Sequence, residues 1–382
     1  MDVDVGTDID LCFESLASMV GRITEEERWE AIRMTCFYER RKWYFPFVDP
    51  RVYKLSSQLF KLPSDRTQTS AHDLGVLDLL PTDILEDILL QLDLRTYRFF
   101  KRVNRRARYF ANNIGIYKRV WQHGKDAIHG LTRTGLSRYI SYGDIHDALM
   151  NPDCTFCGVF GNFLFLPTAK RCCFECLRTS RETAVVCEEK ISKREPWNRL
   201  YNGDNYFDLC DSLVAVRWFR FSDDEWCGWQ NPFTRLHGVL AKDLLAAFVK
   251  VDKSLENYSQ NLLKTGWLHY RLAASIIFPT FNVRTRKIDK GLSCKGCEES
   301  LSRNAEHYDF TKSQDEVFSL PCRIRDLTYC GDGVKEHFLE CEDAQMLWNM
   351  TEDEIKNLPS SNVARHGGGY HVSRTHGYLM EV

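Results

Sequence analysis

The sequence predicts an α+β fold, in which a small three-helix unit precedes irregular modules of mixed helices and short strands that bound metal stabilises. Two observations carry this prediction. Apolar residues of helical period, followed by a basic run, occupy residues 77–112, and two sets of cysteine and histidine at metal-ligand spacing follow at 154–176 and 294–341. A segment as short as 150–180 has too little aliphatic core to fold alone, so metal would substitute for core.

Changes of composition divide the 382 residues into six expected segments. A polar, turn-rich stretch at Pro63–His72 reads as a linker, and the chain beyond Ser360 is rich in Gly, Ser and His. The segments are an N-terminal helical region of unknown role at 1–70, the three-helix unit at 74–120, a first metal-binding module at 121–190, a tryptophan-rich mixed region at 191–290, a second metal-binding module at 291–350 and a flexible tail at 351–382.

The three-helix unit is predicted from residues 77–112. Pro81 suits the first turn of a helix, where its missing N–H is not needed. Apolar residues then recur at helical spacing on one face: Ile84, Leu85, Ile88, Leu89 and Leu92. The segment Arg95–Asn112 (RTYRFFKRVNRRARYFAN) adds two short helices.

The charge changes sign inside this unit. Residues 78–93 carry five acidic residues and no basic one, whereas residues 94–120 carry nine Lys/Arg and no acid. A run of one sign is typical of a solvated face and also suits an acidic partner, either protein or nucleic acid. The net charge of the whole chain is only -2, so any electrostatic attraction must be local.

The N-terminal sequence and the hydropathy of the chain predict a cytoplasmic or nuclear protein. Four aspartates stand in the first ten residues, MDVDVGTDID, which argues against a basic secretory leader. No apolar run reaches the roughly 18 residues of a membrane-spanning helix, so no membrane association is expected. Disulfides are rare in these compartments, and the 15 cysteines therefore need another explanation.

The first set of ligands supplies that explanation. Cys154/Cys157 and Cys173/Cys176 are two CxxC pairs separated by 15 residues. Two residues between ligands allow one tight turn to present both sulfurs to an ion, and Gly158 offers the permissive backbone that such a turn needs. This spacing predicts a structural zinc site. Cys172 could replace Cys173, although Cys173 keeps the two turns identical.

A second zinc site is predicted near the C-terminus. Its candidate ligands are Cys294, Cys297, His337 and Cys341. The last two lie at i and i+4 of a helix predicted over Val334–Trp348, so they would share one helix face. Cys322 and Cys330 lie between the two pairs and remain alternatives.

The region between the two sets is predicted to be mixed. Five of the nine tryptophans fall within residues 190–290, and such a density favours core over ligand binding. Val214–Phe221 (VAVRWFRF) alternates as a strand does, and Lys242–Val251 is predicted to be helical.

Residues 77–110 resemble an F-box. The family's opening Leu-Pro is Leu80-Pro81, its mid-motif Asp is Asp93, and its later Val followed by basic residues is Val103-Asn104-Arg105-Arg106. The whole arrangement also resembles a filamentous-fungal group of F-box proteins. That group carries a CxxCG…FLP…KRCCFxC segment, matched by residues 154–176, and a later GLSCKGC…EHFxxCxxAQxLW segment, matched by residues 291–348.

This resemblance implies the substrate-receptor subunit of a Skp–cullin–F-box ubiquitin ligase. The F-box would dock on an acidic Skp adaptor, and through it on a cullin, while residues 121–382 would present an unidentified protein substrate. Structural zinc, one or two ions, is the expected cofactor. The apolar residues expected to anchor the adaptor are Leu80, Pro81, Ile84, Ile88, Leu92 and Val103.

Two other classes of function are less well supported. A zinc-dependent nucleic-acid-binding or regulatory protein could use the basic segment 95–119, but the chain is slightly acidic overall and neither cysteine set carries a base-reading helix. An enzyme is not expected, because the sequence has no G-x-S-x-G, HExxH, Walker loop or dinucleotide fingerprint. Four ligands in each set also favour closed, structural metal sites over catalytic ones.

Overall fold

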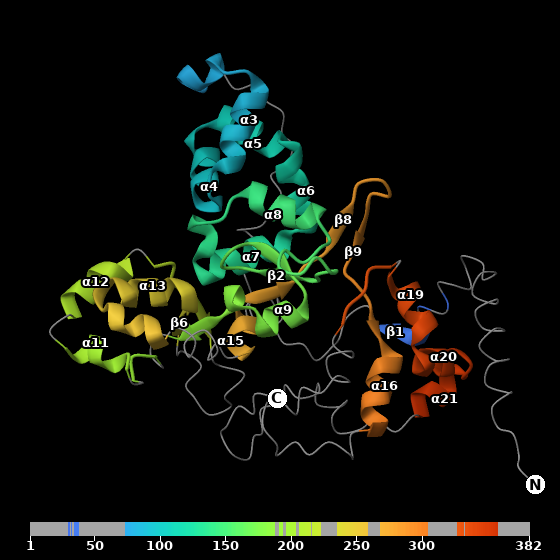
Figure 1. Cartoon of the computed structure of the whole chain (residues 1–382). Coiled ribbons are helices and arrows are strands. Elements are labelled where there is room, and N and C mark those ends of the chain that lie inside the picture. Colours follow the sequence, from blue (N-terminus) through green and yellow to red (C-terminus); the bar gives the residue numbers. More distant parts are fainter. Residues whose placement is uncertain are drawn as a thin grey trace, which may run out of the picture. The chain divides into compact units, whose positions relative to one another are not determined.

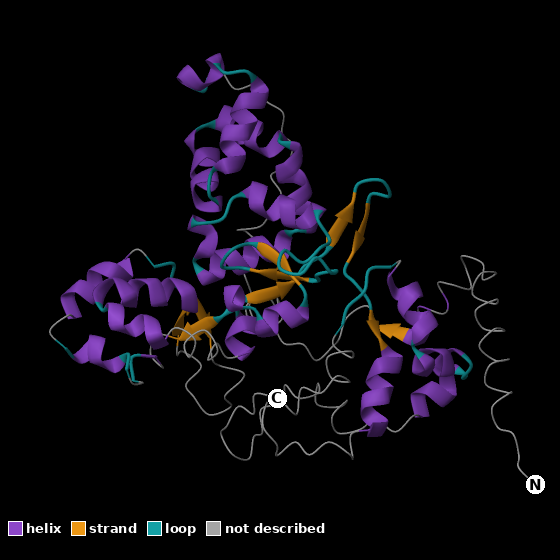
Figure 2. Ribbon diagram, viewed as in Figure 1, coloured by secondary structure: helices purple, strands orange, loops and turns teal. Residues whose placement is uncertain are grey.

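The chain combines helices with small sheets of short antiparallel strands, which confirms the α+β prediction (Figures 1 and 2). The chain divides into two compact units. The larger unit contains the described residues between 73 and 290, and the smaller unit joins those between 30 and 37 to those from 291 onward. This computed structural model describes residues 30, 32, 34–37, 73–187, 191–193, 196–203, 206–214, 216–222, 235–258, 268–304, 327–331 and 333–357.

The larger unit begins with the predicted helices. A 3-10 turn, η2 (Gly75–Leu79), precedes α3 (Thr82–Gln91), α4 (Leu94–Val103) and α5 (Arg105–Asn113). Asp93 caps α4 by accepting hydrogen bonds from the backbone N–H of Arg95 and Thr96, both at 2.9 Å. Asn104 caps α5 in the same way, through the N–H of Ala107 at 2.8 Å. Short polar side chains at these positions therefore separate the three helices.

Only one edge of the apolar face of α3 is buried in the core of the larger unit. Leu85 and Leu89 are buried, whereas Ile84 and Ile88 remain 44% and 42% exposed. Helix α3 is thus apolar toward the core and apolar toward solvent. An exposed apolar edge of this kind is a feature of interaction surfaces.

Three further helices continue this all-helical part: α6 (Gly115–His123), α7 (Lys125–Thr134) and α8 (Tyr142–Met150). Tyr97, Tyr117 and Tyr142 pack at its centre with ring centroids 4.6–5.4 Å apart. The buried Tyr97 hydroxyl donates to the carbonyl of Ala111 at 2.7 Å. The polar end of this ring is thereby satisfied inside the core.

A three-stranded antiparallel sheet, in the order β3-β2-β7, follows the helices. β2 (Phe163–Phe165) pairs with β3 (Lys170–Cys172) and with β7 (Ser275–Ile277), so that Phe163 faces both Cys172 and Ile277. All three residues of β2 are buried. This sheet joins the predicted first metal-binding module to the end of the predicted tryptophan-rich region.

A second three-stranded antiparallel sheet has the strand order β4-β6-β5. It is formed by β4 (Val185–Cys187), β6 (Arg235–Leu240) and β5 (Phe219–Ser222). The helices α11 (Asn198–Asn202), α12 (Tyr206–Val214) and α13 (Ala241–Val251) share its hydrophobic core, in which Trp197 stacks on Phe248 at 5.2 Å. The helix predicted over 242–251 is confirmed. The strand predicted over 214–221 is wrong at its start, because Val214 ends α12 and the strand begins at Phe219.

The remaining described elements of the larger unit are short. They are the 3-10 turns η3 (Leu136–Arg138), η4 (Arg181–Thr183) and η5 (Lys253–Tyr258), the helices α9 (Phe174–Thr179) and α15 (Leu268–Ala273), and the hairpin of β8 (Thr280–Asn282) and β9 (Lys287–Asp289).

The smaller unit combines both ends of the sequence. β1 (Cys36–Phe37) pairs with β10 (Ser293–Cys294), and α16 (Lys295–Asn304), α19 (Gly333–Glu340), α20 (Glu342–Trp348) and α21 (Glu352–Asn357) surround them (Figure 1). The helix α21 stands where a flexible tail was predicted, and the remainder of that tail lies outside the described residues. No described helix is long and apolar enough to cross a bilayer.

Candidate metal centres and an exposed apolar face

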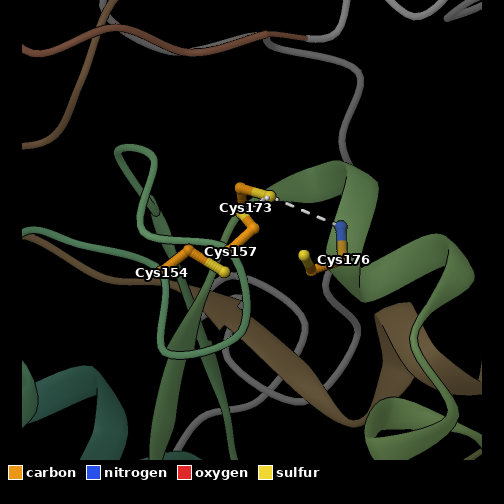
Figure 3. Close-up of side chains that lie close together, drawn as sticks. All are labelled: Cys154, Cys157, Cys173 and Cys176. Carbon is orange, nitrogen blue, oxygen red and sulfur yellow. Dashed lines mark hydrogen bonds between the residues drawn. The ribbon is translucent and has the colours of Figure 1, made fainter.

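The structure brings Cys154, Cys157, Cys173 and Cys176 together, with their sulfur atoms within 4.8 Å of one another. Figure 3 shows that the two members of the first pair come from the loop after α8, and the two of the second pair from the start of α9. The Sγ atoms of Cys157 and Cys173 are 3.6 Å apart. We call these four residues the first cluster.

Backbone turns shape the first cluster. The N–H of Phe156 donates to Cys154 Sγ and that of Cys176 to Cys173 Sγ, both at 3.4 Å. Gly158 closes the first turn by donating to the carbonyl of Cys154 at 2.9 Å, with φ at +79°. This left-handed conformation is strained for any residue with a side chain, which confirms the expected need for glycine there. Amide donors of this kind favour the thiolate form that a metal ligand requires.

The thiols of the first cluster differ in pKa. A hydrogen bond from Cys173 lowers the pKa of Cys154 to about 4, and the same interaction raises the pKa of Cys173. Burial, followed by the neighbouring thiols, raises the pKa of Cys176 to about 12. A divalent cation is the partner that would stabilise the fully ionised set.

Cys172, the alternative to Cys173, lies outside the first cluster. Its side chain is completely buried in β3, and burial raises the pKa of its thiol well above the ordinary value. Cys173 instead occupies the N-terminal cap of α9, one residue after the strand ends. Successive residues of a strand point to opposite sides, so only one of the two can face the cluster.

The second cluster consists of Cys294, Cys297, His337 and Cys341, whose ligand atoms also lie within 4.8 Å of one another. Cys341 Sγ is 3.9 Å from Cys294 Sγ and 3.8 Å from Cys297 Sγ, and Cys297 Sγ is 3.2 Å from His337 Nε2. Tyr329 stacks on the His337 ring at 4.4 Å and limits its orientation. Of the two alternative ligands, Cys330 is not part of this cluster and Cys322 lies outside the described residues.

The prediction that His337 and Cys341 share one face of a continuous helix is wrong. α19 ends at Glu340, and Cys341 is an extended residue that precedes α20. The two short helices bury residues against different neighbours: Val334 of α19 against Ile32, Cys36 and Leu292, and Ala344 of α20 against Cys294 and Cys297. The break turns the Cys341 thiol toward Cys294 and Cys297, and the hydrogen bonds from these two thiols lower the pKa of Cys341.

Both clusters fit zinc. A tetrahedral ion with Zn–S bonds of about 2.3 Å places its sulfur ligands about 3.8 Å apart. The sulfur–sulfur separations of 3.6 Å in the first cluster and 3.8 and 3.9 Å in the second agree with this value. Each cluster offers four Cys/His ligands, which fills the coordination shell and leaves no position for substrate. The clusters are therefore suited to a structural metal.

The residues predicted to bind an adaptor differ in exposure. Pro81, Ile84, Ile88 and Val103 are exposed, and Val103 is 71% exposed. Leu80 and Leu92 are half-buried. Sequence analysis missed Val76 and Leu79, which are 80% and 81% exposed in η2. Their signal was two apolar residues one and four positions before Leu80.

Polar contacts attach η2 to the helices that follow it. Asp78 forms an ion pair with Arg106 at 2.7 Å and accepts a hydrogen bond from the N–H of Leu74 at 2.6 Å. The Asn104 side chain, besides capping α5, donates to the carbonyl of Asp73 at 2.9 Å. The exposed apolar residues of η2 are thus held on the same domain as those of α3 and α4.

The basic segment 95–119 is not a uniform cationic surface. Arg106 is paired with Asp78, and Arg119 contacts His146 at 2.8 Å and lies over the ring of Phe281. Lys101 is half-buried and donates to the Tyr117 hydroxyl at 2.6 Å. Burial lowers the pKa of Lys101 to about 8. These contacts reduce the charge available for a nucleic-acid backbone.

Lys101 gives the protein a predictable pH dependence. Its pKa is about 8 when folded and near the ordinary 10.4 when unfolded. Between about pH 8 and pH 10.4 the unfolded chain binds more protons at Lys101 than the folded protein does, so the free energy of unfolding rises with pH. Below about pH 8 the side chain is charged in both states, and the full cost of burying its charge is then present. We expect the unfolding free energy of the wild type, relative to Lys101→Met, to improve by roughly 1 kcal/mol from pH 7 to pH 10, since partial exposure screens the rest.

Urea denaturation at several pH values measures this difference. Lys118→Met removes a charge from an exposed position of α6 and is the control. A constant difference between wild type and Lys101→Met across the pH range would contradict the prediction.

Comparison with known families identifies one part of the chain. Residues 77–119 match the family model of the F-box domain. This range contains α3, α4 and α5 and all but one of the exposed or half-buried apolar residues described above, the exception being Val76. No curated protein and no solved structure matches the chain.

Proposed function

Because the chain carries an F-box domain at residues 77–119, we propose that it is the substrate-receptor subunit of a Skp–cullin–F-box ubiquitin ligase. F-box domains generally bind Skp-type adaptors. In this chain the F-box would dock on such an adaptor, the zinc-stabilised remainder would present a protein substrate, and no residue would perform catalysis. The complex would act in the cytoplasm, the nucleus or both.

The observation that carries this proposal is the apolar side chains that the domain leaves in solvent. Ile84 and Ile88 stand one turn apart on α3, and Val103 ends α4. Buried apolar anchors dominate the energy of most interfaces, while charges at the rim mainly influence the association rate and its salt dependence. The remaining exposed arginines of α4 and α5 are suited to that second role against an acidic adaptor.

The nucleic-acid alternative receives less support. Lys101, Arg106 and Arg119 are engaged within the protein. Binding to DNA or RNA that falls steeply with salt would revive it.

The test is the affinity of the full-length protein for a Skp adaptor. Ile84→Asp/Ile88→Asp places two charges on the exposed edge of α3 without touching Leu85 or Leu89. We expect Kd to rise at least about 100-fold, as the loss of two anchors implies. Isothermal titration calorimetry measures this, with circular dichroism and metal content confirming that the variant is folded.

Val283→Asp is the matched control, because Val283 is a similarly exposed aliphatic residue outside the F-box. It should bind as the wild type does. Unchanged affinity in the double variant would show that α3 is not the docking face, and a folded wild type that ignores every Skp adaptor would refute the receptor proposal.

A further inference from the structure

The second cluster depends on a segment from the opposite end of the chain. Cys294 lies on β10, a strand of two residues. Its strand partner among the described residues is β1, in the register Cys36 with Cys294 and Phe37 with Ser293 (Figure 1, where β1 is blue beside the orange and red elements). We call the described residues between 30 and 37 the N-terminal clasp.

The clasp contacts three elements that carry metal ligands, namely β10, α16 and α19. Ile32 and Cys36 are buried against Leu292, which precedes β10, and against Val334 of α19, the helix that carries His337. Lys295, located between the ligands Cys294 and Cys297, donates from Nζ to the carbonyl of Met34 at 2.7 Å. These two residues are 261 positions apart in sequence.

The ligands of the second cluster come from segments far apart in sequence, Cys297 and His337 being 40 positions apart. These segments contact each other directly, since Ala344 of α20 is buried against Cys294 and Cys297 and Leu292 pairs with Tyr329, and the clasp adds contacts from a third segment. A strand pair as short as β1–β10 is marginal by itself. The clasp packs on the segments that carry Cys294, Cys297 and His337, so its docking and the positions of these ligands depend on each other.

We propose that the N-terminal clasp is a structural part of the second metal centre, so that metal binding and clasp docking are coupled. The coupling must be reciprocal: the clasp slows metal loss, and the metal keeps the clasp in place. The clasp, a segment to which the sequence assigned no role, would then be part of the predicted second metal-binding module. This inference rests on metal binding by the second cluster and is independent of adaptor binding.

The test uses the full-length protein loaded with zinc, and follows zinc release into a chromogenic chelator. His337→Ala identifies the release phase of the second cluster. Ile32→Asp then puts a carboxylate into the clasp core, where Ile32 is 4% exposed. We expect release from the second cluster to accelerate about tenfold or more, a typical coupling, with release from the first cluster unchanged.

Leu339→Asp is the matched control, since it adds the same charge to an exposed position of the same unit. It should leave both release phases unchanged. Brief trypsin digestion with mass spectrometry provides a second readout: cleavage before residue 40 should be faster in Ile32→Asp and, by reciprocity, in His337→Ala.

Three results would overturn the proposal. The first is that trypsin cleaves the clasp of Ile32→Asp rapidly while zinc release from the second cluster of this variant stays as slow as in the wild type. The second is unchanged cleavage in that variant, which would contradict the packing of Ile32. The third is a wild type with no second release phase, which would refute metal binding by the second cluster and leave the adaptor proposal untouched.

Discussion

Replacing Cys173 by alanine is expected to remove one zinc ion per chain, whereas replacing the adjacent Cys172 is expected to remove none. Cys173 belongs to the first cluster, and Cys172 is a fully buried residue of β3 outside it. Two cysteines that are neighbours in sequence thus have different roles. Their comparison separates the loss of a ligand from the loss of a buried thiol.

The two variants should differ widely in stability. Binding of a structural zinc ion contributes on the order of 10 kcal/mol to folding, and a site with three ligands retains only part of it. We expect Cys173→Ala to lose about 4 kcal/mol or more and to melt roughly 10 °C lower, against about 1 kcal/mol for Cys172→Ala. Metal analysis and thermal denaturation together measure both effects.

A chelator provides the complementary experiment. Added to the wild type, it should lower the melting temperature about as much as Cys173→Ala does, and it should change the already depleted variant less. If Cys172→Ala loses zinc and Cys173→Ala keeps it, the ligand assignment within this pair is reversed. Equal zinc contents in both variants and the wild type would exclude a metal in the first cluster.

Arg171→Met is expected to be the most damaging substitution that touches no metal ligand. The Arg171 side chain is buried and bonds to four carbonyl groups, those of Ala148, Gly161, Phe278 and Pro279, at 2.6–2.9 Å. Burial lowers its pKa to about 10, so the guanidinium is still charged at neutral pH. The Arg171 side chain thus connects three segments: α8, the residues just before β2 and the residues just after β7.

Methionine fills similar space but leaves those carbonyl oxygens without a donor. An unsatisfied buried acceptor costs about 1–3 kcal/mol, so the expected loss is roughly 4 kcal/mol or more. Arg171→Lys should lose most of this as well, because an ammonium cannot reproduce the planar fork. Denaturant unfolding of the full-length protein measures the change.

Arg178→Met is the control for Arg171→Met. The Arg178 side chain pairs with Glu175, three residues earlier on the same helix. A pair of this kind contributes less than about 1 kcal/mol. If Arg171→Met proved as mild as Arg178→Met, the four hydrogen bonds would have no net effect on stability.

Local patterns were sufficient where the relevant contacts are near in sequence. The helices after Pro81 and the turn at Gly158 both depend on bonds within a few residues. The ligands of the first cluster could be predicted for the same reason, since one hairpin presents both pairs. Ile84 was expected to anchor the adaptor because of the resemblance to an F-box, and periodicity alone could not separate it from the buried Leu85, because the period of α3 is the same for a residue in the core and one at an interface.

Contacts between residues far apart in sequence could not be predicted from such local patterns. The helix break at Cys341 has no turn signal, and it follows from the position of Cys294 and Cys297. The pairing of Cys36 with Cys294 joins strands of two residues, too short for any alternation to be detected. Arg171 is a basic residue of a basic stretch (KRCC), and only the packed sheet shows that carbonyls from three separate segments surround it.

The sequence by itself determined the helices of the F-box and the spacing of the two candidate ligand sets, because each rests on local hydrogen bonding or on the fixed spacing that one ion would impose. The tertiary structure alone decided which apolar residues are buried and which are exposed, which of Cys172 and Cys173 joins the first cluster, and which distant segment packs against the second cluster. Those choices depend on packing between segments up to 261 positions apart, and the free energy of such packing is not encoded in any single stretch of the chain.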